Sequence, residues 1–174
     1  VVEFAPRLMT VQVDDVGGSV LRAAVVANLG RLGVAVDPAR NEARSREARV
    51  ISPEGSPVTV AVVDSGVEDT HPDLEGRVDT SRSVKCSVNG VATQDFYGWR
   101  DEFYHGTHVA GIIAANHNDI GIDGIAPEAS IVAIEATNDN RLIYPEYVTC
   151  AFMWAASHGV DVVNNSYSMD PWVY

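Results

Sequence analysis

One aspartate in this 174-residue chain stands where carboxylates commonly do chemistry. Asp64 follows directly on the run VTVAVV (58–63), whose continuous β-branched character is typical of a strand buried on both faces of a parallel sheet. Catalytic groups of open α/β sheets gather at the carboxyl ends of such strands, and Gly66 lets the backbone turn away there. The alternative is a plain turn-forming or helix-capping aspartate.

The segment HGTHVAG (105–111) is the second chemical signal. A histidine accepts and returns a proton near neutral pH because its unperturbed pKa is about 6.5. His105 is expected to open a helix whose glycine and alanine allow close packing against neighbouring backbone. A structural histidine at a helix start is one alternative. A metal site made of His105 and His108 is another, disfavoured because no Asp or Glu follows at ligand spacing.

The elements that must position these residues alternate between strand and helix. Besides residues 58–63, the runs ASIVAIEA (129–136) and VDVVNNSY (160–167) are typical of buried strands. Helices are expected at 108–115 and at about 145–158. Such alternation indicates a parallel α/β sheet.

Four segments resemble one family, in the same order along the chain. VAVVDSGVEDTHPDL (60–74) resembles the aspartate motif of subtilisin-like serine proteases, and HGTHVAGIIAA (105–115) resembles their histidine motif. GIDGIAPEASIVAIEA (121–136) and GVDVVNNSY (159–167) are similar to two further segments of that family. The resemblance implies an α/β subtilisin-like fold, a mainly parallel sheet with helices on both faces, incomplete in this chain.

The resemblance also implies a function, serine-type endopeptidase activity on a polypeptide substrate through an Asp-His-Ser triad. Asp64 would orient His105 and stabilise its imidazolium, and His105 would be the general base that deprotonates the serine. Ser65 is not expected to be that nucleophile, although it is adjacent to Asp64.

Further site residues follow from the same resemblance. Asp73 and Asn118 match positions that commonly ligate a structural Ca²⁺, an ion that prefers oxygen donors; the alternative is an ordinary polar turn.

An edge strand that pairs with the extended substrate is expected at Arg141, Leu142 and Ile143. The strand end lining the pocket for the residue before the scissile bond is expected at Ser166, Tyr167 and Ser168, where family members often have glycine at the last position.

The segment carrying the family's nucleophile is missing from this sequence. No G-T-S and no G-x-S-x-G occurs in it, so the chain alone is expected to be inactive. Three explanations remain: part of a complete protease whose C-terminal half is the partner, an inactive degenerate member, or a calcium-stabilised interaction module. A sheet truncated after its third family-like strand would leave residues 160–167 as an exposed edge.

The N-terminal part differs in character. Residues 10–36 show a strand–helix–strand pattern, followed by a charged and then Pro/Gly-rich stretch. The expected division is a propeptide-like unit or N-terminal extension at 1–40, a charged helix and linker at 41–57, and a partial catalytic domain at 58–174.

Composition limits the partners and the compartment. A hydrophobic fraction of 46% with 21% charged residues favours a compact fold. The net charge of −12 argues against binding of nucleic acid or an anionic membrane. No basic-then-apolar leader follows Val1 and no apolar run reaches membrane-spanning length. Acidity and the family resemblance nevertheless favour a secreted, extracellular protein.

Two cysteines allow one disulfide bond. Cys86 lies in a polar stretch, and Cys150 lies on the helix expected at about 145–158. Its apolar stripe is Val148, Ala151, Phe152 and Ala155. Cys150 points roughly opposite that stripe, so a disulfide and two free thiols both remain open.

Overall fold

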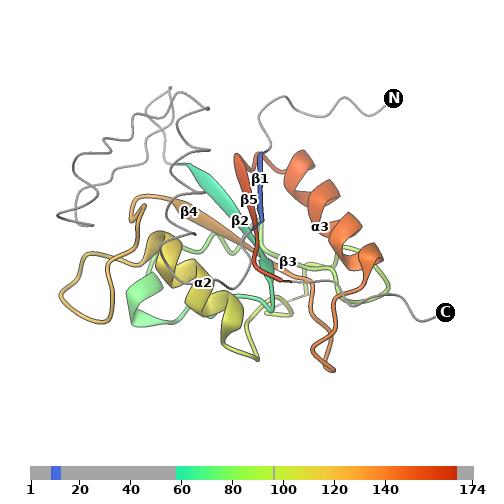
Figure 1. The fold of residues 1–174 in the computed structure, drawn as a ribbon, viewed down its shortest axis with the longest axis horizontal. Helices are drawn as coiled ribbons and strands as arrows, with labels where there is room; N and C mark the ends of the chain where they lie inside the picture. The colour runs from blue at the N-terminus through green and yellow to red at the C-terminus, as the bar shows by residue number, and fades with distance from the viewer. Residues whose placement is uncertain (1–8, 13–57, 96, 168–174) are drawn as a thin grey trace.

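The computed structural model describes residues 9–12, 58–95 and 97–167 (Figure 1). Its core is one five-stranded parallel sheet with the strand order β1-β5-β2-β4-β3. The strands are β1 (Met9–Gln12), β2 (Thr59–Asp64), β3 (Val84–Lys85), β4 (Ser130–Glu135) and β5 (Val162–Asn165).

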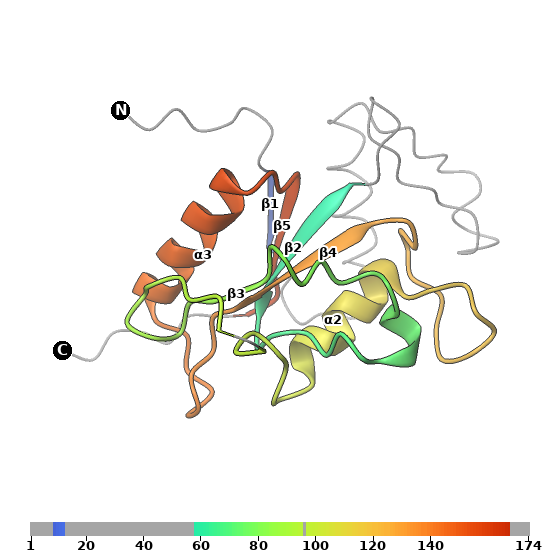
Figure 2. The same cartoon turned by 180° about the vertical axis from the view of Figure 1, so that it is seen from behind.

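A helix covers each face of this sheet, as the two opposite views show (Figures 1 and 2). Helix α2 (His105–Ala114) packs with Val60 and Val62 of β2 in one hydrophobic cluster. Helix α3 (Pro145–Ser157) packs with Ala61 and Val63 of the same strand in the other. Burial on both faces explains why β2 is apolar at successive positions. The predicted α/β class, with helices on both faces, is confirmed.

The central strands begin and end close to their expected positions. β2 spans 59–64 and β4 spans 130–135, within a residue of the expected bounds at each end. β5 stops at Asn165, because the chain leaves the sheet before Ser166. None of the helices in the described part of the chain is both long and apolar enough to cross a bilayer.

The edge of β5 differs from the sequence-based expectation. β1 pairs with β5 in parallel, with Met9 opposite Val162 and Gln12 opposite Asn165. The expectation that residues 160–167 form an open edge is therefore wrong, because a distant strand satisfies the backbone groups there. The remaining residues of the expected units 1–40 and 41–57 lie outside the described residues.

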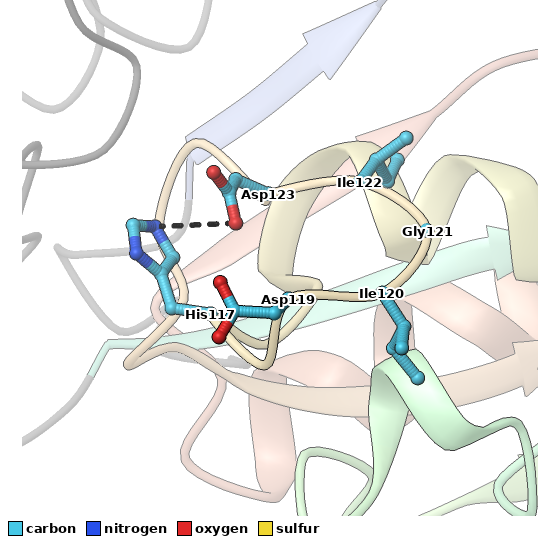
Figure 3. A pocket seen from close by; sticks show the side chains of 6 residues that line it. All are labelled: His117, Asp119, Ile120, Gly121, Ile122 and Asp123. Carbon is cyan, nitrogen blue, oxygen red and sulfur yellow. Dashed lines mark ion pairs between the residues drawn. The ribbon is translucent and has the colours of Figure 1, made fainter.

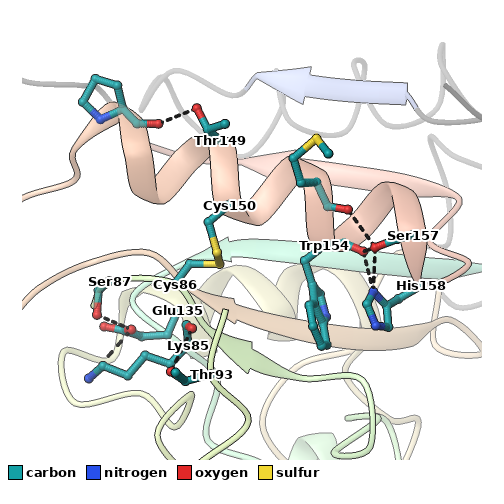
Figure 4. The surroundings of a disulfide bond; sticks show 12 residues. Lys85, Cys86, Ser87, Thr93, Glu135, Thr149, Cys150, Trp154, Ser157 and His158 are labelled. Atoms are coloured by element: carbon teal, nitrogen blue, oxygen red, sulfur yellow. Dashed lines mark hydrogen bonds and ion pairs between the residues drawn. A yellow bond between two sulfur atoms is a disulfide. The ribbon is translucent and has the colours of Figure 1, made fainter. Parts of the chain in front are cut away.

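A disulfide joins Cys86 to Cys150 and ties helix α3 to the segment after β3 (Figure 4). The bond resolves the alternative that the sequence left open. The expected helix face was wrong in part: Ala151 and Ala155 are buried as expected, but Cys150 is buried too, whereas Val148 and Phe152 are only half-buried. The buried face of α3 consists of Tyr147, Cys150, Ala151 and Ala155.

Candidate active site

An aspartate and a histidine from neighbouring elements meet at the carboxyl edge of the sheet. Asp64 is the last residue of β2, and His105 is the first residue of α2. Nδ1 of His105 lies 2.7 Å from Oδ1 of Asp64. The same carboxylate oxygen accepts a hydrogen bond from the backbone N–H of Ser65 at 2.7 Å. The structure thus brings together the two residues predicted to form the catalytic pair.

The two side chains differ sharply in their exposure to solvent. Only 4% of the Asp64 side chain is exposed, against 53% of the His105 side chain. A buried carboxylate that accepts the Nδ1 proton holds the ring in one tautomer and leaves Nε2 as the basic nitrogen. The arrangement can therefore take a proton from a hydroxyl group presented to the exposed part of the ring.

Two glycines allow close backbone approach beside the pair, Gly66 toward the segment before α2 and Gly106 toward the end of β2. Gly66 adopts φ +103°, a left-handed conformation, and a Cβ there would lie 2.8 Å from the Arg100 carbonyl oxygen. A Cβ on Gly106 would overlap the Gly66 carbonyl oxygen and lie 3.0 Å from Cβ of Asp64. The expected close packing of this helix therefore has a direct steric basis.

Asp101 is a residue of this site that the sequence reasoning missed. It is 8% exposed and accepts a hydrogen bond from the Ser65 hydroxyl at 2.9 Å. Its other oxygen accepts from the N–H of Thr107 at 2.8 Å and from its hydroxyl. An aspartate shortly before a helix start is a capping signal, which was available in the sequence. The Ser65 hydroxyl thus joins the residue after Asp64 to this carboxylate.

The expected substrate-pairing strand at Arg141, Leu142 and Ile143 is not a strand in the structure. Asn138 instead closes a tight turn, with its N–H donating to the Leu142 carbonyl at 3.0 Å and its Oδ1 accepting from the Leu142 N–H at 3.1 Å. The Asn138 side chain thereby takes up a backbone N–H that the expected strand would present to a substrate, so the pairing of this segment with a substrate stays a prediction. Arg141, at φ 62°, lies over the ring of Phe103 at 5.0 Å.

The expected pocket residues after β5 are partly described. Ser166 and Tyr167 are half-buried, and Ser168 lies outside the described residues. The Tyr167 hydroxyl donates to Oδ1 of Asn165 at 2.8 Å. Burial, with a smaller contribution from the charge of Asp64, raises the pKa of the Tyr167 phenol.

A buried glutamate lies in register with Asp64 on the neighbouring strand. Glu135 ends β4 and is opposite Asp64 in the β2–β4 pairing. It accepts a hydrogen bond from the Ser87 hydroxyl at 2.7 Å and lies 3.9 Å from Nζ of Lys85 (Figure 4). Burial outweighs both contacts and raises the pKa of Glu135 to about 7. The carboxyl edge of the sheet thus holds a second buried carboxyl group, in register with Asp64.

The two expected calcium ligands lie in adjoining segments. Asp73 belongs to the short helix η2 (Pro72–Leu74), and Asn118 donates to the Pro72 carbonyl at 3.3 Å. Oδ2 of Asp73 accepts from the Ile122 N–H at 2.9 Å. Oδ1 of Asp73 is buried without a hydrogen-bond partner among the described residues. An orphaned buried carboxylate oxygen fits a cation ligand, although Oδ1 of Asn118 already accepts from the Ile120 N–H.

The outer side of the same loop carries a different group of polar residues. His117 and Asp123 face each other with Nε2 and Oδ1 3.9 Å apart, beside Asp119, in a pocket of about 320 Å³ (Figure 3). Within the described residues, no three His, Cys, Asp or Glu side chains are placed to hold a metal ion together.

A comparison with protein families matches residues 55–172 to the subtilase family, a family of peptidases. The match covers more than half of the chain. The chain therefore belongs to the subtilase family, as the motifs around Asp64 and His105 led us to expect.

Individual relatives agree with this assignment. Fervidolysin of Fervidobacterium pennivorans is 41% identical over 120 residues, covering 65% of this chain and 17% of its own. Subtilisin E of Bacillus subtilis is 39% identical over 112 residues, covering 64% of this chain and 27% of its own. A solved structure of the serine protease of Aeromonas sobria with its chaperone matches at a TM-score of 0.53 and 34% identity, covering 67% of this chain and 19% of that one.

The chain spans well under half the length of each of these relatives. Two further relatives have names that give different compartments. One is a minor extracellular protease of Bacillus subtilis, and the other is an intracellular serine protease of Paenibacillus polymyxa.

Proposed function

We propose that this chain is the Asp-His part of a subtilisin-like serine endopeptidase, with a serine supplied by a segment that is not in this sequence. The observation that carries the proposal is the 2.7 Å contact between Nδ1 of His105 and Oδ1 of buried Asp64. The pair lies within the segment that matches the subtilase family, at residues 55–172.

In the proposed mechanism, His105 takes the proton of the serine hydroxyl on Nε2 as the serine attacks the scissile carbonyl. Asp64 keeps the proton on Nδ1 and stabilises the imidazolium that forms. His105 then gives its proton to the leaving amine. The half-exposed ring can reach an external hydroxyl, while burial protects the carboxylate from water.

A chimera tests this function. Residues 58–167 would replace the matching segment of subtilisin E, and the rest of subtilisin E would contribute the nucleophilic serine. Hydrolysis of a peptide substrate by this chimera would then be measured. We expect turnover, reduced about 10³-fold or more by His105→Ala and by Asp64→Ala. A chimera that folds and binds a peptide inhibitor but has no turnover would contradict the proposal and favour an inactive family member.

The proposed substrate is an extended polypeptide. The segment at Arg141, Leu142 and Ile143 would pair with its backbone after the turn at Asn138 opens, and Ser166, Tyr167 and Ser168 would line the pocket before the scissile bond. The exposure of the His105 side chain supports access of a polypeptide to this site. The turn at 138–142 has to open before this segment can pair with a substrate. In the chimera, Asn138→Gly should therefore lower KM, because it removes the side chain that accepts from the Leu142 N–H.

Calcium is proposed as a structural ion held by Asp73 and Asn118. The buried, unpartnered Oδ1 of Asp73 supports this assignment. Bound Ca²⁺ would supply a positive charge for that oxygen and would stabilise the fold by mass action. Millimolar CaCl₂ should raise the Tm of the chain and of the exposed-site control Asp139→Asn, but not that of Asp73→Asn; an equal shift in all three would refute the site.

A secreted, extracellular location is also proposed. The disulfide between Cys86 and Cys150 supports it, because such bonds persist in oxidising compartments. The proposed partner is the C-terminal half of the same protease, which would bring the serine. Recovery of the chain from culture medium, with no thiol available for alkylation, is the expected result.

A further inference from the structure

The strongest unassigned feature is a closed hydrogen-bond network beside the Asp64–His105 pair. Its centre is the buried carboxylate of Asp101. One oxygen accepts from the backbone N–H groups of Phe103 and Tyr104, both at 2.8 Å, and from the Ser65 hydroxyl at 2.9 Å. The other oxygen accepts from the N–H and the hydroxyl of Thr107. Five donors therefore converge on one side chain.

The network connects the strand that carries the aspartate to the helix that carries the histidine. The Ser65 hydroxyl donates to Asp101 and accepts from the Gly106 N–H at 3.0 Å. Ser65 follows Asp64 directly, and Gly106 follows His105 directly. Each member of the pair thus has an immediate neighbour in the same bridge. The Thr107 hydroxyl adds a second link, because it accepts from the N–H of Glu68 at 3.0 Å.

The start of α2 needs such support from outside the helix. Its N-cap residue, Tyr104, has φ 66° and makes no side-chain capping hydrogen bond. The first N–H groups of a helix lack intrahelical acceptors, and the positive end of the helix dipole disfavours an imidazolium placed there. The carboxylate of Asp101 satisfies the N–H of Thr107 and adds a negative charge near His105.

We propose that Asp101 is a positioning residue for the catalytic pair, and that it acts through the Ser65 hydroxyl and the first turn of α2 to hold His105 against Asp64. The inference rests on the proposed function, since it assigns a role within that site. Asp101 itself does not touch the reacting atoms. Its carboxylate has two separable effects, one on the place of the His105 ring and one on its charge.

The test is histidine-ring NMR of the 174-residue chain, recording the His105 Nδ1–H resonance and the pH midpoint of the ring. Asp101→Asn should lower that midpoint by roughly 0.5 to 1 unit, because the variant removes a negative charge near the imidazolium. It should also speed solvent exchange of the Nδ1 proton. The matched control is Asp95→Asn, an exposed aspartate earlier in the same segment, which should behave like the unmodified chain.

A second variant separates position from charge. Ser65→Ala keeps the Asp101 carboxylate but breaks its bridge to Gly106. Its midpoint should stay near that of the unmodified chain, while exchange of the Nδ1 proton becomes faster. This variant also serves if Asp101→Asn does not fold, which circular dichroism would show.

The outcomes distinguish the two proposals. An Nδ1–H signal and midpoint that are the same in Asp101→Asn, Ser65→Ala and Asp95→Asn would overturn the positioning role alone. Absence of a hydrogen-bonded Nδ1 proton in the unmodified, folded chain would instead count against the Asp64–His105 pair and the proposed function.

Discussion

Gly106 shows how a single residue type controls the distance between the histidine helix and the aspartate strand. Gly106→Ala would place a Cβ against the Gly66 carbonyl oxygen, which is backbone and cannot swing away. We expect a loss of about 1–3 kcal/mol in the free energy of unfolding, because overpacking forces the elements apart. Urea denaturation measures this loss.

The control for this substitution lies in the same helix. A Cβ on Gly111 would make an ordinary contact with Cδ1 of Ile122 at 3.7 Å. Gly111→Ala should therefore be neutral or stabilising by up to about 1 kcal/mol, as alanine favours helix. Equal destabilisation by both variants would show that close approach at Gly106 is not the cause.

Ionisation of Glu135 makes the free energy of unfolding depend on pH. Burial raises its pKa from 4.5 to about 7, so the folded state binds this proton more tightly than the unfolded state does. The favourable contribution is complete below about pH 4.5 and is lost as the pH rises through 7. The loss is on the order of 3 kcal/mol by linkage, from a shift of about 2.5 pKa units.

Glu135→Gln keeps an oxygen that can accept from the Ser87 hydroxyl but cannot ionise. We expect this variant to lose less stability than the unmodified chain between pH 5 and pH 8, in urea denaturation at each pH. Glu128→Gln, at an exposed position, is the control and should follow the unmodified chain. Parallel pH profiles for all three proteins would contradict the role of burial at Glu135.

At the scale of elements, the disulfide fixes α3 to the segment after β3. Cys86 and Cys150 are 64 residues apart in sequence, so the bond closes a long loop in the unfolded chain. Loop-closure entropy predicts that Cys86→Ser with Cys150→Ser costs about 4 kcal/mol of stability. Denaturation with and without a reductant measures it. The reductant should destabilise only the unmodified chain, and a reductant effect on the double variant would point to another cause.

The elements that the sequence could predict are those with strong local patterns. β2, β4 and the start of α2 at His105 followed from apolar runs and motifs of a few residues. β1 was expected as a strand, but its pairing with β5 links residues about 150 positions apart, and no local pattern encodes such a contact. The turn at Asn138 was not predicted for another reason. Its side-chain oxygen accepts from a backbone N–H that the family resemblance assigns to the substrate.

The same distinction holds within the site. Asp64 and His105 were identifiable because their neighbours form recognisable motifs. The bridge through Asp101 was not, because it depends on which hydroxyl and N–H groups converge after folding. The pairing of Cys150 with Cys86 likewise depends on how α3 is rotated against the sheet, which the apolar stripe alone placed incorrectly.

In the whole molecule, a hydrogen-bonded Asp64–His105 pair occurs together with a sequence that has no G-T-S motif. The described sheet has helices on both faces and β1 along the edge of β5. The serine-bearing segment that we propose would either pair with another edge of the sheet or take the place of β1 beside β5. If that segment displaces β1, deletion of residues 1–12 should increase the amount of it that the chain binds. A pull-down of the segment, with the full 174-residue chain as the comparison, measures this increase.

Covalent labelling by a fluorophosphonate, mapped by mass spectrometry, tests whether this chain supplies the aspartate and histidine to a serine on another segment. The 174-residue chain should not be labelled, because it carries the pair but no activated serine. The subtilisin E chimera should be labelled at the serine from subtilisin E alone, and His105→Ala should abolish that labelling. Labelling of the chain at one of its own serines, such as Ser65 or Ser166, would contradict the account, as would labelling of the chimera that does not depend on His105.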